Sequence, residues 1–295
     1  MNPRMAGFLL LSSHLGEADR RPLTMAQMRE LAKRVRLMER KDPERELNPQ
    51  DLMAIGYDRG MAERICGLLR DTQQLSWYVN RGKKAGCQPI TRVCQAYPGV
   101  LRRRLGLEAP GCLWAKGDLS LLSRPAVALV GSRDLSAANK EFARQVGIQA
   151  ARQGYVLISG NARGADRTAQ SACLKAGGSV ISILADSLEQ REETPNVLWL
   201  SEDGFDQPFS AIRALSRNRL IHSLGMVTFV AQSHLETGGT WDGTANNLRH
   251  GWSPVLCYED GADATAALKD RGAWGVGVDD LKDFSALIPA EHTLL

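Results

Sequence analysis

Two glycine-containing turns carry residue types suited to binding an anion. Gly131-Ser132-Arg133 follows the apolar run Ala126–Val130, and a Gly-Asn-Ala-Arg-Gly turn at 160–164 follows the apolar run Tyr155–Ile158. Glycine lets the backbone approach a ligand closely, and unpaired N–H groups at the start of a helix favour negative charge. Each turn also supplies an arginine. The repeated chemistry predicts a phosphate-binding edge; the alternative is a pair of ordinary turns whose arginines face solvent.

The segment between the two turns has helical spacing. Apolar residues recur at positions 142, 146, 148, 150 and 151, Ser136 is placed to cap the start of the helix, and Gly154 is placed to end it. A strand, a helix and a second strand in this order form a unit with parallel strands. Both turns are therefore expected at the carboxyl end of a strand, where each opens a helix.

A third feature is the run Arg217-Asn218-Arg219, whose neighbours in the chain are apolar. Arginine holds phosphates bidentately, and asparagine bonds a base or pins a loop. An equally weighted alternative is that the three side chains brace nearby loops through carboxylates such as Asp166. Asp166 itself is placed to cap backbone N–H groups.

A fourth feature is the segment from Thr237 to Thr244, which holds three glycines and three threonines. It is predicted to lie in a glycine-rich loop from Leu235 to Thr244, where its N–H and O–H groups are possible donors to an anion. Stacking on a base is one role for Trp241. Packing within its own domain is the commoner role of a loop tryptophan and is favoured.

Several well-defined site patterns are absent. The chain has no GxGxxG fingerprint and no GxxxxGK[ST] loop, which argues against the NAD and ATP forms of phosphate binding. The five histidines show no HExxH or paired spacing, so no metal site is expected. No GxSxG follows a strand, so serine-nucleophile chemistry is not favoured.

The elements that must position these turns alternate regularly from Ala126 onward. Strands are predicted over 126–130, 155–159, 179–184, 197–200, 226–231 and 254–258, and helices over about 136–153, 165–176, 209–223, 246–250 and 262–269. Such alternation predicts an α/β fold with a Rossmann-like, doubly wound, mainly parallel sheet. Ligands of such sheets bind beyond the carboxyl ends of the strands, where both glycine turns are expected.

Length and charge suggest two domains. The 295 residues divide into a helical N-terminal domain, residues 1–90, and a Rossmann-like domain, residues 91–295. Residues 1–104 hold 20 Lys and Arg against 11 Asp and Glu, whereas residues 105–295 hold 17 against 22. The basic excess hints at a polyanionic partner, although solvated helix faces give the same count. The six cysteines form no CxxC pattern and no apolar run suffices for a membrane span, so a cytoplasmic protein without membrane attachment is expected.

The four features together resemble the DprA/Smf family of bacterial DNA-processing proteins. The resemblance rests on LWAKGDLSLLSRPAVALVGSR, the SGNARGAD turn, SRNRLI and the GGTWDGT segment, and covers roughly residues 95–260. It implies a Rossmann-like fold that binds and protects single-stranded DNA, assists loading of a RecA-type recombinase in natural transformation or recombination, forms a homodimer, and performs no catalysis. No cofactor is expected.

Carried onto matching positions, the resemblance implies a set of phosphate-binding residues on four segments. They are Gly131, Ser132 and Arg133; Ser159, Gly160, Arg163, Gly164 and Asp166; Arg217, Asn218 and Arg219; and Gly239 and Thr240.

Two other functions stay open on the sequence. The first is a phosphoribohydrolase-like enzyme acting on nucleoside monophosphates, whose glycine-rich loop resembles the segment 238–247. Here Asn247 stands where the catalytic glutamate would be, and an amide cannot act as a carboxylate base. The second is a sensor of a small nucleotide signal that uses the same glycine and arginine edge.

Overall fold

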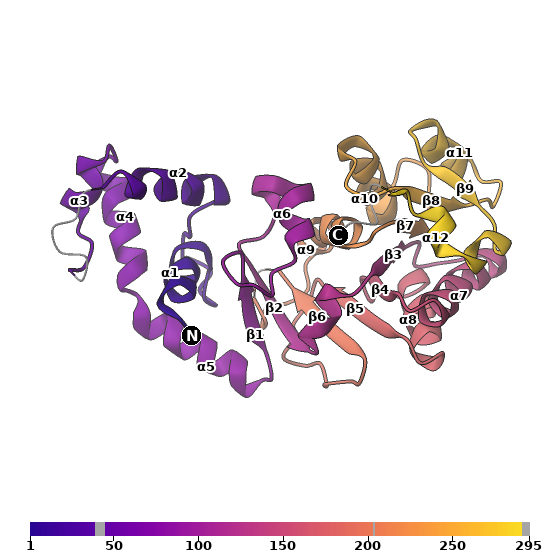
Figure 1. The fold of residues 1–295 in the computed structure, drawn as a ribbon, viewed down its shortest axis with the longest axis horizontal. Helices are drawn as coiled ribbons and strands as arrows, with labels where there is room; N and C mark the ends of the chain where they lie inside the picture. Colours follow the sequence, from indigo (N-terminus) through magenta and orange to yellow (C-terminus); the bar gives the residue numbers. More distant parts are fainter. Residues whose placement is uncertain (39–44, 203, 291–295) are drawn as a thin grey trace.

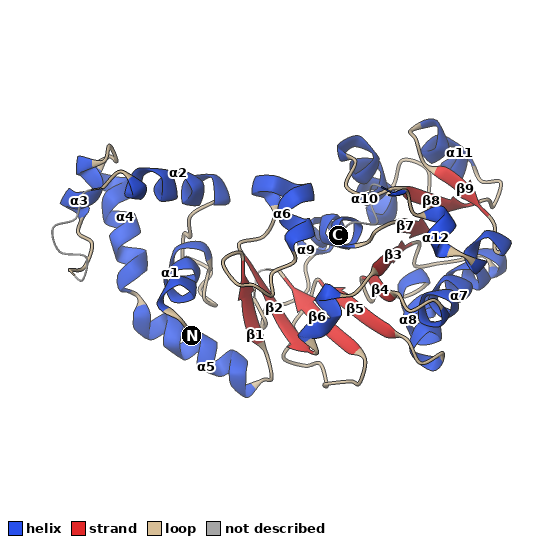
Figure 2. Ribbon diagram, viewed as in Figure 1, coloured by secondary structure: helices blue, strands red, loops and turns tan. Residues whose placement is uncertain are grey.

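A nine-stranded sheet forms the centre of the computed structural model, which describes residues 1–38, 45–202 and 204–290 (Figures 1 and 2). In spatial order the strands are β1 (Gln88–Thr91), β2 (Cys112–Gly117), β6 (Val197–Ser201), β5 (Ser179–Leu184), β4 (Val156–Ser159), β3 (Ala126–Val130), β7 (Thr228–Val230), β8 (Val255–Tyr258) and β9 (Trp274–Val276). The β1–β2 and β2–β6 pairs are antiparallel, and the other pairs are parallel. From β3 the chain builds outward to β6 and then crosses to β7 on the other side of β3. The doubly wound fold is thus confirmed, with its switch point between β3 and β7.

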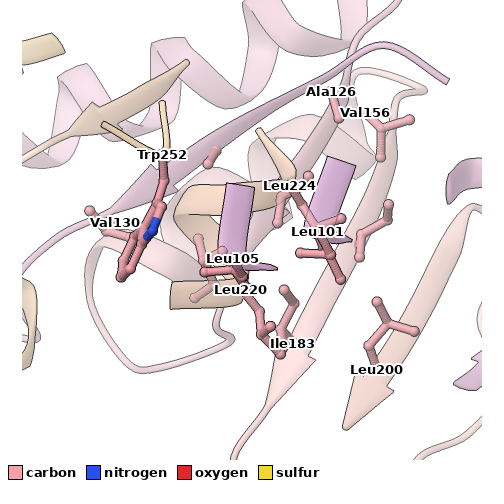
Figure 3. Close-up of a cluster of buried hydrophobic side chains, with 14 of the residues drawn as sticks. Leu101, Leu105, Ala126, Val130, Val156, Ile183, Leu200, Leu220, Leu224 and Trp252 are labelled. Atoms are coloured by element: carbon pink, nitrogen blue, oxygen red, sulfur yellow. The ribbon is translucent and has the colours of Figure 1, made fainter. Parts of the chain in front are cut away.

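Helices cover both faces of this sheet because its central strands are apolar on both sides. Along β3, Ala126, Ala128 and Val130 face one core, while Val127 and Leu129 face the other. The first core is covered by α6 (Gly99–Leu105), α9 (Ala211–Leu224), α10 (Gly238–His250) and α11 (Asp263–Asp270); the second by α7 (Ala137–Arg152), α8 (Ala165–Lys175) and α12 (Phe284–Leu287). Figure 3 shows leucines of α6 and α9 packed over the strands in the first core.

The predicted helix between the two glycine turns is α7. Ser136 caps it by accepting a hydrogen bond from the Asn139 N–H at 3.2 Å, and Gly154 follows its end with a φ of 78°. That φ lies in the left-handed region, which glycine adopts without steric strain.

The prediction of a loop from Leu235 to Thr244 is wrong, because α10 begins at Gly238. Glycines within a helix cost about 1 kcal/mol each relative to alanine, so local propensity disfavours this start. Tertiary packing offsets it: a Cβ at Gly243 would lie 3.1 Å from the Asn218 Cβ, so glycine lets α10 approach α9 closely. Trp241 is buried, with the Arg271 guanidinium 4.8 Å from its ring centre, which confirms the packing role.

The N-terminal helices are α1 (Pro3–Ser12), α2 (Met25–Arg36), α3 (Pro49–Ala54), α4 (Arg59–Arg70) and α5 (Thr72–Lys84). α1 and α5 share a core with the sheet, in which the rings of Tyr78, Trp114 and Phe205 lie 4.8–5.2 Å apart. The predicted domain boundary between residues 90 and 91 falls within β1. The division of the chain into two domains stays a prediction. In the described residues no helix is long and apolar enough to cross a membrane.

A buried polar cluster lies beneath α9 and α10. The Asn247 Nδ2 donates to His222 Nδ1 and to the Ser253 Oγ, each at 3.1 Å, and the Asn247 Oδ1 accepts from the Ser253 N–H at 2.9 Å. Burial lowers the pKa of His222 to about 3. His222 is therefore neutral in the folded protein, and its Nδ1 is the acceptor for Asn247.

We predict that Gly147→Ala destabilises the protein. The added Cβ in α7 would lie 2.1 Å from the Ala169 carbonyl oxygen in α8, and relieving such overpacking costs about 1–3 kcal/mol. Gly67→Ala is the matched control, since Gly67 also lies within a helix but a Cβ added there would meet no other part of the protein within 4 Å, apart from its chain neighbours and the backbone of its own helix. Urea unfolding should show a lower midpoint for the first variant and an equal or higher one for the second. Equal midpoints would contradict the close approach of α7 and α8.

We also predict that His222 makes the folded state sensitive to acid. The unfolded protein protonates His222 near its ordinary pKa of 6.5, whereas the folded protein does so only near pH 3. The stability from neutral His222 is therefore fully present above about pH 6.5 and is lost as the pH falls, by up to about 1.4 kcal/mol per pH unit.

Urea unfolding of wild type and His222→Gln between about pH 8 and pH 4.5 measures this contribution. The variant should be less stable at pH 8, because Asn247 loses a partner, but its stability should fall less steeply with acid. Parallel curves for the two proteins would show that His222 does not titrate as described.

Candidate nucleic-acid interface

The carboxyl ends of β3, β4, β5 and β7 form an edge with two hollows, here called the rim. The first hollow, of about 460 Å³, lies between the turn after β3, α9 and the start of α10. The second, of about 310 Å³, lies between the turn after β4, the end of β5 and α9. The residues that line both hollows are Arg133, Ala162, Phe209, Ala214 and Arg217. The two predicted turns thus meet at one place.

In the turn after β3, two residues shape the backbone and one offers charge. A Cβ at Gly131 would lie 2.5 Å from the Ala165 Cβ, so α8 starts against this glycine. Ser132 is buried; its N–H donates to the Gln232 carbonyl at 2.9 Å, and its Oγ lies 3.1 Å from His234 Nε2. Arg133 is exposed and makes no hydrogen bond or ion pair with any residue that the structure describes. Arg133 is therefore available to an external anion.

In the turn after β4, the protein's own carboxylate occupies part of the expected anion site. The buried Asp166 accepts hydrogen bonds from the Gly160 N–H at 3.2 Å and the Ala162 N–H at 3.1 Å. Burial raises the pKa of Asp166, and the nearby Arg217 guanidinium opposes that shift. Asp166 therefore caps amides of the turn, so these two N–H groups are not available to a phosphate. Ser159 is fully buried and lines neither hollow.

Of the remaining residues of this turn, Gly164 is half-buried and Arg163 is exposed. Gly164 has a φ of 87°, and a Cβ added to it would lie 2.4 Å from the Ser132 and Arg133 carbonyl oxygens, so the two turns pack together. Arg163 forms an ion pair with Asp134 at 2.8 Å, and both side chains are more than 70% exposed. An exposed pair of this kind is worth about 0–1 kcal/mol, so a phosphate can compete for the arginine.

The three residues Arg217, Asn218 and Arg219 point in different directions from α9. Arg217 is buried under the rim and donates to the Ile183 carbonyl at 2.7 Å. Asn218 donates to the Gly239 carbonyl at 2.9 Å and so ties α9 to the start of α10. Arg219 pairs with Glu202 and lines neither hollow. The bracing role thus describes all three side chains: Arg219 acts through Glu202, and Arg217 and Asn218 act through backbone carbonyls. The charge of Asp166 also acts on Arg217.

The start of α10 supplies the first hollow with a helix N-terminus. Gly239 and Thr240 line this hollow. The N-cap residue Thr237 makes no side-chain capping bond, and the first turn contains no acidic residue. The positive end of the helix dipole therefore faces the hollow without an acidic residue in the first turn of the helix to balance it.

Sequence reasoning missed an apolar surface beside the rim. Phe209 lines both hollows and is 60% exposed, while Ile212 and Leu215 on the first turns of α9 are 80% and 49% exposed. The signal in the sequence was the presence of three large apolar residues within the first turns of α9 and just before it. Arg167 and Arg191, which line the second hollow, were also missed. Among the described residues, no three His, Cys, Asp or Glu side chains gather as a metal site would require.

Comparison with known proteins relates this chain to one family. A sequence model described as DNA recombination-mediator protein A matches residues 88–253. The chain is 33% identical to the DNA processing protein DprA of Streptococcus pneumoniae over 141 residues, which cover 44% of this chain and 50% of that protein. It is 27% identical to the Bacillus subtilis DprA over 167 residues, 53% of this chain and 56% of that protein. The chain thus aligns with about half the length of these curated relatives.

Solved structures agree with the fold. The X-ray structure of S. pneumoniae DprA matches with a TM-score of 0.66 and 26% identity, covering 85% of this chain and 91% of that chain. A Helicobacter pylori DprA structure, described as giving insight into a single-stranded DNA binding mode, matches with a TM-score of 0.56 and 23% identity, covering 68% of this chain and 96% of that chain. With the family model spanning more than half of the sequence, the chain belongs to the DNA recombination-mediator protein A family, the DprA/Smf proteins.

Proposed function

We propose that the rim binds the phosphodiester backbone of single-stranded DNA and that the chain acts in DNA processing without catalysing a reaction on the strand. The observation that carries this proposal is Arg133, an exposed cation without a protein partner among the described residues, at the junction of both hollows. The family and the binding mode described for the H. pylori relative support it.

Each hollow offers a different means of holding a phosphate. In the first, the α10 N-terminus at Gly239 and Thr240 supplies partial positive charge next to Arg133. In the second, Arg163 and Arg167 supply full charges near Arg133. Two sites that share one arginine suit adjacent phosphates of a strand better than a single small nucleotide.

The apolar side chains beside the rim suit the bases. Phe209 lines both hollows, so a backbone held at Arg133 leaves its bases next to the exposed ring. Base–aromatic stacking is worth about 1–3 kcal/mol per base and tolerates any sequence. The rim therefore combines a positive track with a stacking surface.

The buried position of Asn247 supports the absence of catalysis. Asn247 occupies the position of a catalytic glutamate in the phosphoribohydrolase alternative, yet its side chain is 0% exposed and fully engaged with His222 and Ser253. It lines neither hollow of the rim. From the family resemblance we further propose a cytoplasmic homodimer that protects the strand and assists loading of a RecA-type recombinase.

Fluorescence anisotropy with a labelled single strand tests the proposed function directly. The protein should bind the single strand more tightly than duplex DNA, and affinity should fall steeply with salt, since bound phosphates release counterions. A nucleoside monophosphate should compete only weakly. No retention of single strand, or equal affinity for the monophosphate, would overturn the proposal.

We predict that Arg133→Ala weakens binding of every single-stranded sequence. Loss of one phosphate contact should reduce the slope of log affinity against log salt by about 0.7. Arg249→Ala is the matched control: it removes an equal charge from the last turn of α10, at the end of that helix opposite the rim. If Arg133→Ala binds like wild type across a salt titration, Arg133 does not contact the backbone.

We predict a different signature for Phe209→Ala. Removing the ring should lower single-strand affinity by about 1–3 kcal/mol, or roughly 5- to 150-fold, through lost stacking. The salt slope should not change, because no charge is removed. Phe209→Trp should retain binding, whereas Ile212→Ala, in the same exposed apolar surface but lining neither hollow, should have little effect. A changed salt slope for Phe209→Ala would contradict a stacking role.

A further inference from the structure

A third and larger hollow, of about 970 Å³, lies between the outer surfaces of α7 and α8 and is here called the helix groove. It begins at the rim, because Arg133 and Asp134 line both the helix groove and the first rim hollow, and Arg163 and Arg167 line both the groove and the second. The rim and the helix groove therefore adjoin at Arg133 and form one continuous surface.

The fold explains the shape of this groove. α7 and α8 both start at the carboxyl edge of the parallel sheet, so they run side by side away from the rim. Their backbones approach closely where Gly147 meets the Ala169 carbonyl. Small residues at this contact leave a channel on the outer side, which the long side chains of both helices border.

The groove is strongly basic. Seven basic side chains line it against one carboxylate, that of Asp134; the basic residues are Arg133, Lys140, Arg144, Arg152, Arg163, Arg167 and Lys175. Residues 105–295 contain 17 basic and 22 acidic residues, so this channel concentrates positive charge on a part of the chain that is otherwise acidic. A solvated helix face more commonly mixes both signs.

The basic residues form two rows that face one another. Lys140, Arg144 and Arg152 follow the four-residue spacing of one ridge along α7, and Arg167 and Lys175 belong to α8. Within the described part of the chain, Lys140, Arg152 and Lys175 make no ion pair, whereas Arg144 pairs with Glu141. Of the seven basic residues, Arg144 and Arg163 pair with carboxylates, so five cations along the groove have no counterion among the described residues.

We propose that the helix groove is a second phosphate track, along which a single strand continues after it leaves the rim; this rests on the function proposed above. From Lys140 to Arg152 the helix rises about 18 Å, at ~1.5 Å per residue. At the ~3.4 Å rise per nucleotide of B-form DNA, a stacked strand places at most about five phosphates over that length, and an extended strand places fewer. The groove has no exposed aromatic residue in its lining, so it holds the backbone without stacking the bases.

A triple variant, Lys140→Gln, Arg152→Gln and Lys175→Gln, tests the proposal, because glutamine keeps part of each side chain and removes only the charge. A short oligonucleotide of about six residues, which the rim alone can hold, should bind with unchanged affinity. A strand of about 20 residues should bind the variant more weakly, with a salt slope reduced by about 2, or roughly 0.7 for each lost contact. Affinity should stop rising at a shorter strand length than in wild type.

The control is Arg249→Gln, Lys269→Gln and Lys282→Gln, which removes the same net charge from exposed positions outside the rim and the groove. This control variant should bind the long strand more tightly than the groove variant does, and its affinity should depend on strand length as in wild type. Equal urea midpoints for wild type and the groove variant would show that the folded state is intact.

The results separate failure of the groove from failure of the rim. If the groove variant binds long strands with wild-type affinity and salt slope while Arg133→Ala does not, the second track is wrong and the proposed function stands. If wild type binds neither oligonucleotide, the proposed function itself fails. If the groove variant keeps strand binding but loses binding of polyglutamate, the groove serves an acidic polypeptide, which also overturns the proposal.

Discussion

The shape of the rim depends on the packing of the buried Arg217 guanidinium against Gly160. A Cβ at Gly160 would lie 1.7 Å from Arg217 Nη1, and this guanidinium is held in place by the Ile183 carbonyl. Burial lowers the pKa of Arg217, while the charge of Asp166 opposes that shift. A buried charge without an opposite charge nearby is strongly destabilising, so the turn after β4 must keep Asp166 inward. In this inward position Asp166 accepts hydrogen bonds from the Gly160 and Ala162 amides.

This arrangement divides the arginines of the site into two groups. Arg217 and Arg219 are satisfied within the protein, by a carbonyl and by Glu202, and they fix α9 against the sheet. Arg133 and Arg163 lie at the surface, where a ligand can reach them. A charged side chain that stabilises the fold must be buried and paired, whereas a charged side chain that binds a polyanion must be exposed and only weakly paired. Residue type alone does not distinguish these roles.

The sequence predicted the features that depend on local signals and missed those that depend on contacts between distant elements. Alternating apolar runs identified the doubly wound sheet, and the caps at Ser136 and Gly154 identified α7, since these signals are local. The start of α10 was missed because the contact of Gly243 with Asn218 comes from α9, which is distant in the chain. The exposed Phe209 was missed for a similar reason, since an apolar residue in a helical pattern suggests burial unless neighbouring elements are known.

The close contact between α7 and α8 links the packing of the fold to its electrostatics. Gly147 brings the two helices together on the sheet side, which leaves their long basic side chains facing one another on the outer side. Like charges gathered along one groove repel one another, and a bound polyanion offsets that repulsion. The repulsion is limited where Glu141 neutralises Arg144, but Lys140, Arg152 and Lys175 have no such partner among the described residues. This charge pattern is the one expected of the proposed phosphate track that starts at the rim.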